Sequence, residues 1–137
     1  MEYTIYTDGG VYNNQFPLKR KAYLSLKTYD DGGNLIHHHK EKRLPYGTTN
    51  NQCEYMAVEA ALDNDRNGIN DLTIAPTNLI IYSDSQLVVK QLAGEYKVRS
   101  ENIKPLYTRV KEKFENYPIP VQLQWVSRDI TVEKLGH

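Results

Sequence analysis

Three acidic residues that are far apart along the chain occupy equivalent places in the predicted secondary structure. Asp8 follows the strand-like residues 3–7, Asp84 ends the strand that contains the apolar run 79–82, and Glu54 falls in the first turn of a predicted helix. If the two strands are parallel neighbours, both aspartates emerge at one edge of the sheet, where open α/β sheets bind ligands. A helix packed across the sheet would bring Glu54 to the same point. The sequence therefore predicts one acidic pocket.

This grouping of acidic residues implies a bound cation. Carboxylates at close range repel one another unless a positive charge compensates them. Oxygen ligands select the hard divalent cations Mg²⁺ and Mn²⁺. Two such ions about 4 Å apart can hold both the attacking water and the leaving oxygen of a phosphodiester. The predicted chemistry is therefore metal-dependent hydrolysis of a nucleic-acid backbone.

Each acidic residue also has a purely structural explanation. Asp8 precedes Gly9 and Gly10, and an aspartate in that position often belongs to a turn. Asp84 could be the N-cap of the helix that follows it, and Glu54 could complement the dipole of its helix. Each explanation accounts for one residue, but none accounts for all three falling where one pocket can form.

The elements that must position these residues predict one α/β domain. Two predicted strands, residues 21–29 and 35–42, flank an Asp-Asp-Gly-Gly-Asn turn, and with residues 3–7 they form an antiparallel meander. Helices and strands follow at residues 52–66, 79–82, 86–92, 103–114 and 121–126, and residues 131–135 open a possible last helix. This order favours a five-stranded mixed sheet with helices on both faces, in a single domain over residues 1–137 whose last helix is short or truncated.

The composition is that of an ordinary globular protein. Of the 137 residues, 39% are hydrophobic and 25% charged, and no window approaches the roughly 18 apolar residues of a membrane span. The 17 basic and 17 acidic side chains cancel, although nucleic-acid-binding proteins are often basic. The basic residues do cluster locally, at residues 19–21, 40–43 and 97–99. The single cysteine, Cys53, excludes an internal disulfide, so we expect a reducing, cytoplasmic location and a monomer without membrane association.

Several segments together resemble type 1 ribonuclease H. Its three leading motifs look like residues 5–10 (Ile-Tyr-Thr-Asp-Gly-Gly), 48–57 (Thr-Thr-Asn-Asn-Gln-Cys-Glu-Tyr-Met-Ala) and 81–86 (Ile-Tyr-Ser-Asp-Ser-Gln). The compact bacterial and archaeal branch of the family has stretches similar to residues 92–98, 102–106 and 125–128. The resemblance covers nearly the whole chain with the motifs in the family's order, and it implies a ribonuclease H-like fold.

The resemblance implies an endoribonuclease that cuts the RNA strand of an RNA–DNA hybrid and leaves 3′-hydroxyl and 5′-phosphate ends. On this basis Asp8, Glu54 and Asp84 are catalytic and bind two Mg²⁺ or Mn²⁺ ions. Amide side chains suit the 2′-hydroxyl group, which distinguishes RNA from DNA and both donates and accepts hydrogen bonds. The nucleic-acid contacts implied are Gly10, Asn50 and Gln86 at 2′-hydroxyls, Thr49 and Asn14 at a phosphate of the DNA strand, and Asn51, Lys97 and Arg99. The basic stretch that holds Lys97 and Arg99 could instead be a solvated helix start.

The chain departs from the family pattern in two places. The loop after Gly10, which contains Asn14, lacks the family's Gly-Asn-Pro-Gly run. The family's last helix usually carries a fourth catalytic aspartate, and the tail here has none in that register. Alignment places His137 at this fourth catalytic position, with Asp129 and Glu133 as rivals. A neutral imidazole suits Mg²⁺ less well than a carboxylate does.

Two alternative functions follow from these departures. One is a catalytically silent nucleic-acid-binding domain, and the other is a different nuclease of the same fold, such as a junction resolvase or an exonuclease. The second alternative is the weaker, because Asn50 and Gln86 suit recognition of a 2′-hydroxyl that DNA lacks.

Overall fold

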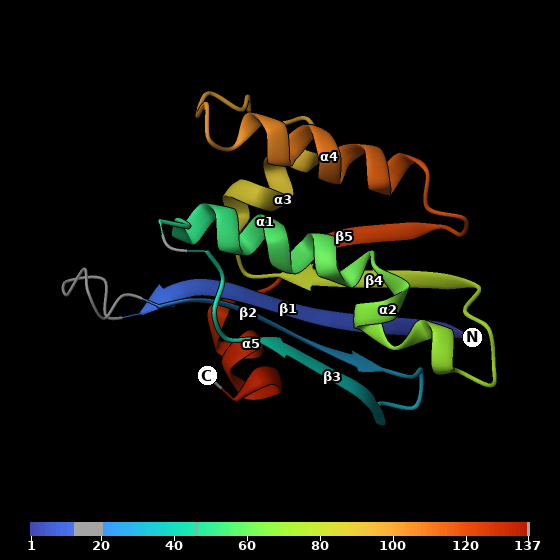
Figure 1. The fold of residues 1–137 in the computed structure, drawn as a ribbon. Helices are drawn as coiled ribbons and strands as arrows, with labels where there is room; N and C mark the ends of the chain where they lie inside the picture. The colour runs from blue at the N-terminus through green and yellow to red at the C-terminus, as the bar shows by residue number, and fades with distance from the viewer. Residues whose placement is uncertain (13–20, 46, 137) are drawn as a thin grey trace.

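The computed structural model describes residues 1–12, 21–45 and 47–136 and is built on one five-stranded sheet (Figure 1). The strands lie in the order β3-β2-β1-β4-β5. β1 pairs antiparallel with β2, as β2 does with β3, whereas β4 runs parallel to both β1 and β5. The strand bounds are β1 Glu2–Tyr12, β2 Lys21–Tyr29, β3 Leu35–Glu41, β4 Asn78–Ser83 and β5 Val121–Trp125. The predicted mixed sheet with its antiparallel meander is confirmed.

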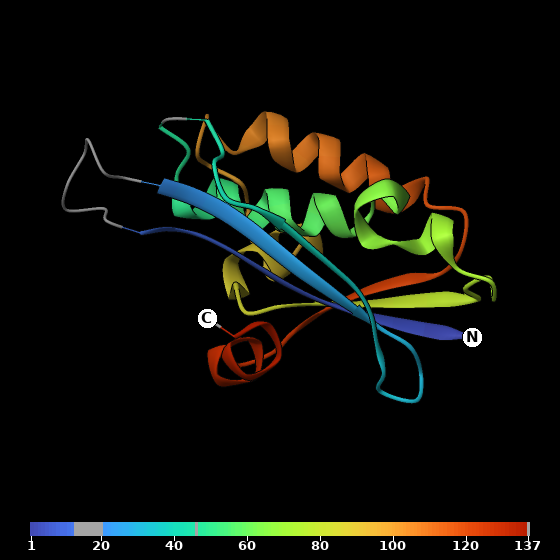
Figure 2. The same cartoon turned by 60° about the horizontal axis from the view of Figure 1, so that its bottom comes forward.

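Helices cover both faces of this sheet. α1, α3 and α4 lie over one face, and α5 packs against the opposite face (Figure 2). The helix bounds are α1 Asn50–Ala61, α2 Asn64–Asn67, the 3₁₀ helix η2 Ile69–Asp71, α3 Gln86–Leu92, α4 Lys104–Glu115 and α5 Arg128–Leu135. Within the described ranges, no helix is both long enough and apolar enough to cross a membrane.

The core lies between the sheet and α1. Alternate residues of the central strands, among them Ile5, Leu24 and Ile81, point to this side and are fully buried, as expected for a sheet with period-two alternation. On α1, Tyr55 and Val58 are also fully buried, together with the small residues Ala57, Ala60 and Ala61. These small side chains let the helix lie close to the sheet, which matters for the position of Glu54.

Three predicted boundaries were wrong by three residues or more. The first strand does not stop after residue 7, because residues 8–12 keep pairing with β2, from Asp8 opposite Ser25 to Tyr12 opposite Lys21. The helix predicted over residues 52–66 ends at Ala61, because the Asp63 side chain accepts from the Asp65 amide and starts the separate turn α2. The last helix begins at Arg128, not at residue 131.

Candidate active site

The sheet places Asp8 and Asp84 side by side. The parallel pairing of β1 with β4 ends at Thr7 opposite Ser83, so each aspartate is the next residue after the last paired residue of its strand. Asp8 itself lies inside β1, which continues along β2 alone, and its explanation as a turn residue is wrong. Asp84 is not a helix cap either, because Ser85 caps α3 by accepting a hydrogen bond from the Val88 amide at 3.2 Å.

A close approach of α1 to β1 brings in Glu54. A Cβ atom on Gly9 would lie 2.3 Å from the carbonyl oxygen of Cys53, a distance that no side chain could tolerate, so only glycine allows this packing. Glu54 is the fifth residue of α1, one position beyond the first turn in which the sequence placed it. The start of the helix is tied to the same strand, because the Val11 amide donates to Asn50 Oδ1 at 2.7 Å.

The three carboxylates form one tight cluster. Asp8, Glu54 and Asp84 each offer an oxygen, and these atoms all lie within 4.8 Å of one another. Asp8 is 1% exposed, and Glu54 Oε2 is buried with no hydrogen-bond partner among the described residues. Burial, followed by the charges of Asp84 and Asp8, raises the pKa of Glu54 to about 9, although Arg128 and the Gly9 amide oppose the shift. The positive charge near the cluster is therefore too small to compensate three ionised carboxylates.

This donor set fits a divalent cation. It consists only of carboxylate oxygens close enough to share one ion, and Glu54 supplies a buried oxygen that has no hydrogen-bond partner in the described part of the chain. Hard cations such as Mg²⁺ and Mn²⁺ prefer such ligands. Among the residues that the structure describes, no other group of three His, Cys, Asp or Glu side chains could hold a metal.

α5 contributes a cation and a hydroxyl to the edge of the cluster. Arg128 Nη1 lies 3.4 Å from Asp8 Oδ1 and 3.2 Å from Asp84 Oδ2, so one guanidinium bridges two of the acids. Thr131 Oγ1 donates to Asp84 Oδ2 at 2.6 Å. From the sheet, the Tyr23 hydroxyl donates to Asp8 Oδ2 at 3.1 Å. Burial, and then the Asp8 charge, raises the pKa of Tyr23 to about 12, which keeps this donor protonated.

Arg128→Gln is expected to destabilise the protein when divalent ions are removed. The substitution takes away the charge between Asp8 and Asp84, but the Arg128 side chain is 59% exposed, so solvent screening limits the cost to about 1 kcal/mol. Thermal melting in EDTA should show this deficit, and Mg²⁺ should reduce it. The control is Lys104→Gln, which breaks the exposed ion pair with Glu101 (2.9 Å). Equal melting of Arg128→Gln and wild type in EDTA would exclude a charge-compensating role.

Comparison with known proteins places this site in a family. The family model of RNase H matches residues 1–128. The chain belongs to the RNase H family. Its acidic cluster is thus the candidate active site of a ribonuclease H, as the sequence motifs predicted.

The fold is shared with solved RNase H1 structures. RNase H1 from the halophilic archaeon Halobacterium salinarum is 23% identical, with a TM-score of 0.76 over 96% of this chain and 89% of that one. LC11-RNase H1, isolated from compost by a metagenomic approach and solved in complex with an RNA/DNA hybrid, is 24% identical with the same TM-score and coverage. The N-terminal RNase H domain of a Mycobacterium tuberculosis protein is 22% identical, with a TM-score of 0.71 over 96% and 86% of the two chains.

Three of the predicted nucleic-acid contacts of this RNase H line the acidic groove. Gly10, Asn50 and Asn51 form its wall together with Glu54 and Asp84. Asn50 Oδ1 accepts from the Val11 amide, which fixes the orientation of the side-chain amide, so its amide hydrogens can be offered to a ligand. This orientation suits Asn50 to the role of a donor, although Oδ1 keeps a second lone pair.

Four other predicted contacts, Thr49, Gln86, Lys97 and Arg99, do not line this groove. Thr49 is the N-cap of α1, where its Oγ1 accepts from the Gln52 amide at 3.2 Å. Gln86 is exposed at the start of α3 and lines a neighbouring hollow with Trp125. Lys97 and Arg99 are exposed in the segment between α3 and α4. Asn14 lies outside the described residues.

Among the described residues, no acidic side chain occupies the fourth catalytic position of the family. His137 lies outside the described residues. Asp129 and Glu133 are exposed on α5 and do not belong to the acidic cluster. On the described part of α5, the side chains that reach the cluster are those of Arg128 and Thr131.

Sequence reasoning missed Arg128, Thr131 and Tyr23 as site residues. Arg128 was part of a motif, residues 125–128, that carried the family resemblance, and this motif was the available signal. Tyr23 gave none, because its place beside Asp8 depends on the register between β1 and β2. Thr131 was assigned to a helix start, whereas it lies one turn inside α5.

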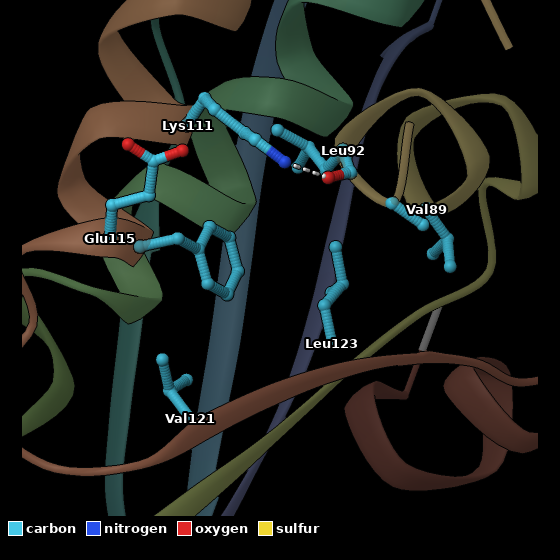
Figure 3. A pocket seen from close by; sticks show the side chains of 8 residues that line it. Val89, Leu92, Lys111, Glu115, Val121 and Leu123 are labelled. Atoms are coloured by element: carbon cyan, nitrogen blue, oxygen red, sulfur yellow. Dashed lines mark hydrogen bonds between the residues drawn. The ribbon is translucent and has the colours of Figure 1, made fainter. Parts of the chain in front are cut away.

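A second hollow, between α3, α4 and β5, is separate from this site (Figure 3). Its walls include the apolar side chains of Leu92, Val121 and Leu123. The Lys111 ammonium group donates to the carbonyl oxygen of Leu92 at 2.8 Å. The hollow holds no cluster of metal ligands, so the hydrolytic chemistry is assigned to the acidic groove.

Proposed function

We propose that the protein hydrolyses the RNA strand of RNA–DNA hybrids with two Mg²⁺ or Mn²⁺ ions and leaves 3′-hydroxyl and 5′-phosphate ends. The observation that carries this proposal is the cluster of Asp8, Glu54 and Asp84 in a chain of the RNase H family, with a buried Glu54 oxygen that no described residue hydrogen-bonds. The hybrid bound in the LC11-RNase H1 structure supports the choice of substrate.

The three carboxylates would hold the cations at the carboxyl end of β4. When bound, the ions supply a Lewis acid for the phosphate and lower the pKa of the attacking water. Asp8 and Asp84 are fixed in place from several sides, by the Tyr23 and Thr131 hydroxyls and by Arg128. This support preorganises the ligands, so little rearrangement is needed when substrate and ions arrive.

Selection for RNA would come from the groove beside the carboxylates. Asn50 presents amide hydrogens there, and a 2′-hydroxyl oxygen can accept one of them. Gly10 has no side chain, so a sugar can approach its backbone closely; an added Cβ would already contact the Tyr23 ring at 3.3 Å. A deoxyribose lacks the acceptor and would leave the Asn50 amide hydrogens without that partner.

Cleavage of an end-labelled RNA–DNA hybrid tests this function. We expect cutting of the RNA strand in Mg²⁺ or Mn²⁺, none in EDTA, and none of an all-DNA duplex of the same sequence. Ligation of the 5′ ends of the products, without prior phosphorylation, would establish the end groups. Hybrid binding without cleavage would replace the proposal with a catalytically silent binding domain, and cleavage of the DNA duplex would replace it with a DNA nuclease.

A further inference from the structure

Another hollow, distinct from the one in Figure 3, continues from the acidic groove across the meander of β1, β2 and β3. It is lined by Tyr12, Tyr23, Lys40, Lys42 and Arg128. Tyr12, Tyr23 and Arg128 also line the acidic groove, so the two hollows share a wall. The surface formed by Tyr12, Tyr23, Lys40 and Lys42, hereafter the lysine–tyrosine surface, is therefore continuous with the carboxylates.

The register of the sheet places this surface on the face from which Asp8 projects. Asp8 lies opposite Ser25, and Ser25 lies opposite Lys40, so the three residues form one row across β1, β2 and β3. Directly opposed residues point to the same face of a sheet. Two strand spacings separate Asp8 from Lys40, a distance of about 10 Å. That distance corresponds to at most about three nucleotides of one strand, since a strand carries one charge per about 3.4 Å of helix axis.

The two lysines are placed to meet a polyanion. Both are exposed, and Lys42 follows directly after the end of the edge strand β3. Glu41, the acid between them, points to the opposite face, where it pairs with Arg66 at 3.3 Å. Within the described ranges, neither Lys40 nor Lys42 forms an ion pair with an acidic side chain. Their charges are thus available to a ligand.

The tyrosines add an aromatic wall between the lysines and the carboxylates. Tyr12 is 44% exposed, and its ring centroid lies 5.8 Å from that of Tyr23. Aromatic rings in a cationic groove are typical of surfaces that follow a nucleic-acid strand, because the rings can stack on bases or sugars. An acidic peptide would match the lysines but would gain less from the exposed ring.

We propose that the lysine–tyrosine surface binds the backbone of the strand being cut, within about three nucleotides on one side of the cleavage point. The inference rests on the proposed function, because the carboxylates at the end of the surface define which strand is cut. Lys40 and Lys42 contact phosphates, and Tyr12 packs against a base or sugar. None of these side chains acts on the reacting phosphate.

Lys40→Gln/Lys42→Gln tests the surface. We expect the Kd of a hybrid to rise about tenfold at low salt, and the slope of log K against log salt to become shallower by nearly two, because each phosphate contact contributes about 0.9. KM should rise with kcat changed less than twofold. The control, Lys104→Gln/Lys111→Gln, removes two charges from α4 that line neither the acidic groove nor the hollow of the lysine–tyrosine surface. Tyr12→Ala should also raise KM, and Tyr12→Phe should restore it.

Shortening the substrate identifies the strand that is bound. A short central block of ribonucleotides fixes the cut, and the cleaved strand is then trimmed from either end while its complement stays full length. When the cleaved strand is trimmed on the side that would lie on the lysine–tyrosine surface, the double variant and the wild type should bind the hybrid with the same Kd. A difference that persists after trimming on both sides would assign the lysines to the complementary strand and overturn the proposal, as would an unchanged Kd and salt slope. If wild type fails to cut any hybrid, the proposed function is wrong, and the salt slope still shows whether the lysines contact nucleic acid.

Discussion

Asp84→Asn is expected to lower the rate of hybrid cleavage by about 10³-fold or more, equivalent to about 4 kcal/mol of transition-state stabilisation. The asparagine keeps the shape of the side chain, and its oxygen can still accept from Thr131 Oγ1, which lies 2.6 Å from Asp84 Oδ2 in the wild type. What is lost is the negative charge that would hold a cation between Asp84 and Asp8. Single-turnover cleavage in Mg²⁺ and in Mn²⁺ measures the loss.

Binding and a second variant distinguish this result from misfolding. Asp84→Asn should bind the hybrid with an affinity within a few-fold of wild type, because its groove and basic surfaces are unchanged. Asp31→Asn is the matched control: Asp31 is an exposed acid of the turn between β2 and β3, outside the cluster, and its substitution should leave cleavage nearly unchanged. Wild-type rates in Asp84→Asn, or an equal loss in Asp31→Asn, would show that the acidic cluster is assigned incorrectly.

The meeting of the three acids was predictable because it depends on strong local patterns. The apolar run in residues 79–82 marked a buried strand, and the runs that precede Asp8 and follow Thr49 marked another strand and a helix start. Parallel neighbours in a sheet end at a common edge, so the two aspartates had to be close. The identity of the residues around them was less accessible, because it depends on pairing between distant segments.

Tyr23 and Arg128 illustrate that limit. Tyr23 reaches Asp8 because β1 extends beyond β4 and keeps its pairing with β2 up to Tyr12. No local pattern gives that extension, since Gly9 and Gly10 are more common in turns than in strands. Arg128 reaches the cluster because α5 begins three residues earlier than predicted and folds back onto the face opposite α1. Both positions arise from tertiary packing and not from the preferences of the segments themselves.

The role of Gly9 also depends on tertiary packing. In the sequence it indicates a turn, but in the structure it allows the Cys53 carbonyl to lie against the strand. The close approach that follows is what forces Glu54 next to two other acids. The three carboxylates thus repel one another beside a well-packed core and lower the stability of the folded protein. Such a loss of stability is common in a preorganised active site.

Because of this repulsion, we expect one substitution to lower activity and to raise stability. Glu54→Gln should abolish most hybrid cleavage, yet it should stabilise the metal-free protein at alkaline pH. Burial and the charges of Asp84 and Asp8 raise the pKa of Glu54 in the folded protein to about 9, whereas an unfolded chain has the ordinary glutamate value of about 4.3. Between these two values the folded protein holds a proton that the unfolded chain releases. Stability therefore falls as pH rises through this window.

Melting curves in EDTA from pH 4.5 to pH 9 measure this effect. The wild type should lose stability, by up to about 1.4 kcal/mol per pH unit and on the order of a few kcal/mol in total, relative to Glu54→Gln. The two proteins should be equally stable near pH 4.5. Saturating Mg²⁺ should remove most of the wild-type deficit, because the cation provides the missing charge. The exposed Glu95→Gln serves as the control and should follow the wild type. If stability changed with pH in the same way for wild type and Glu54→Gln, the Glu54 carboxylate would already be compensated without a metal. The electrostatic argument for a cation at this cluster would then be wrong.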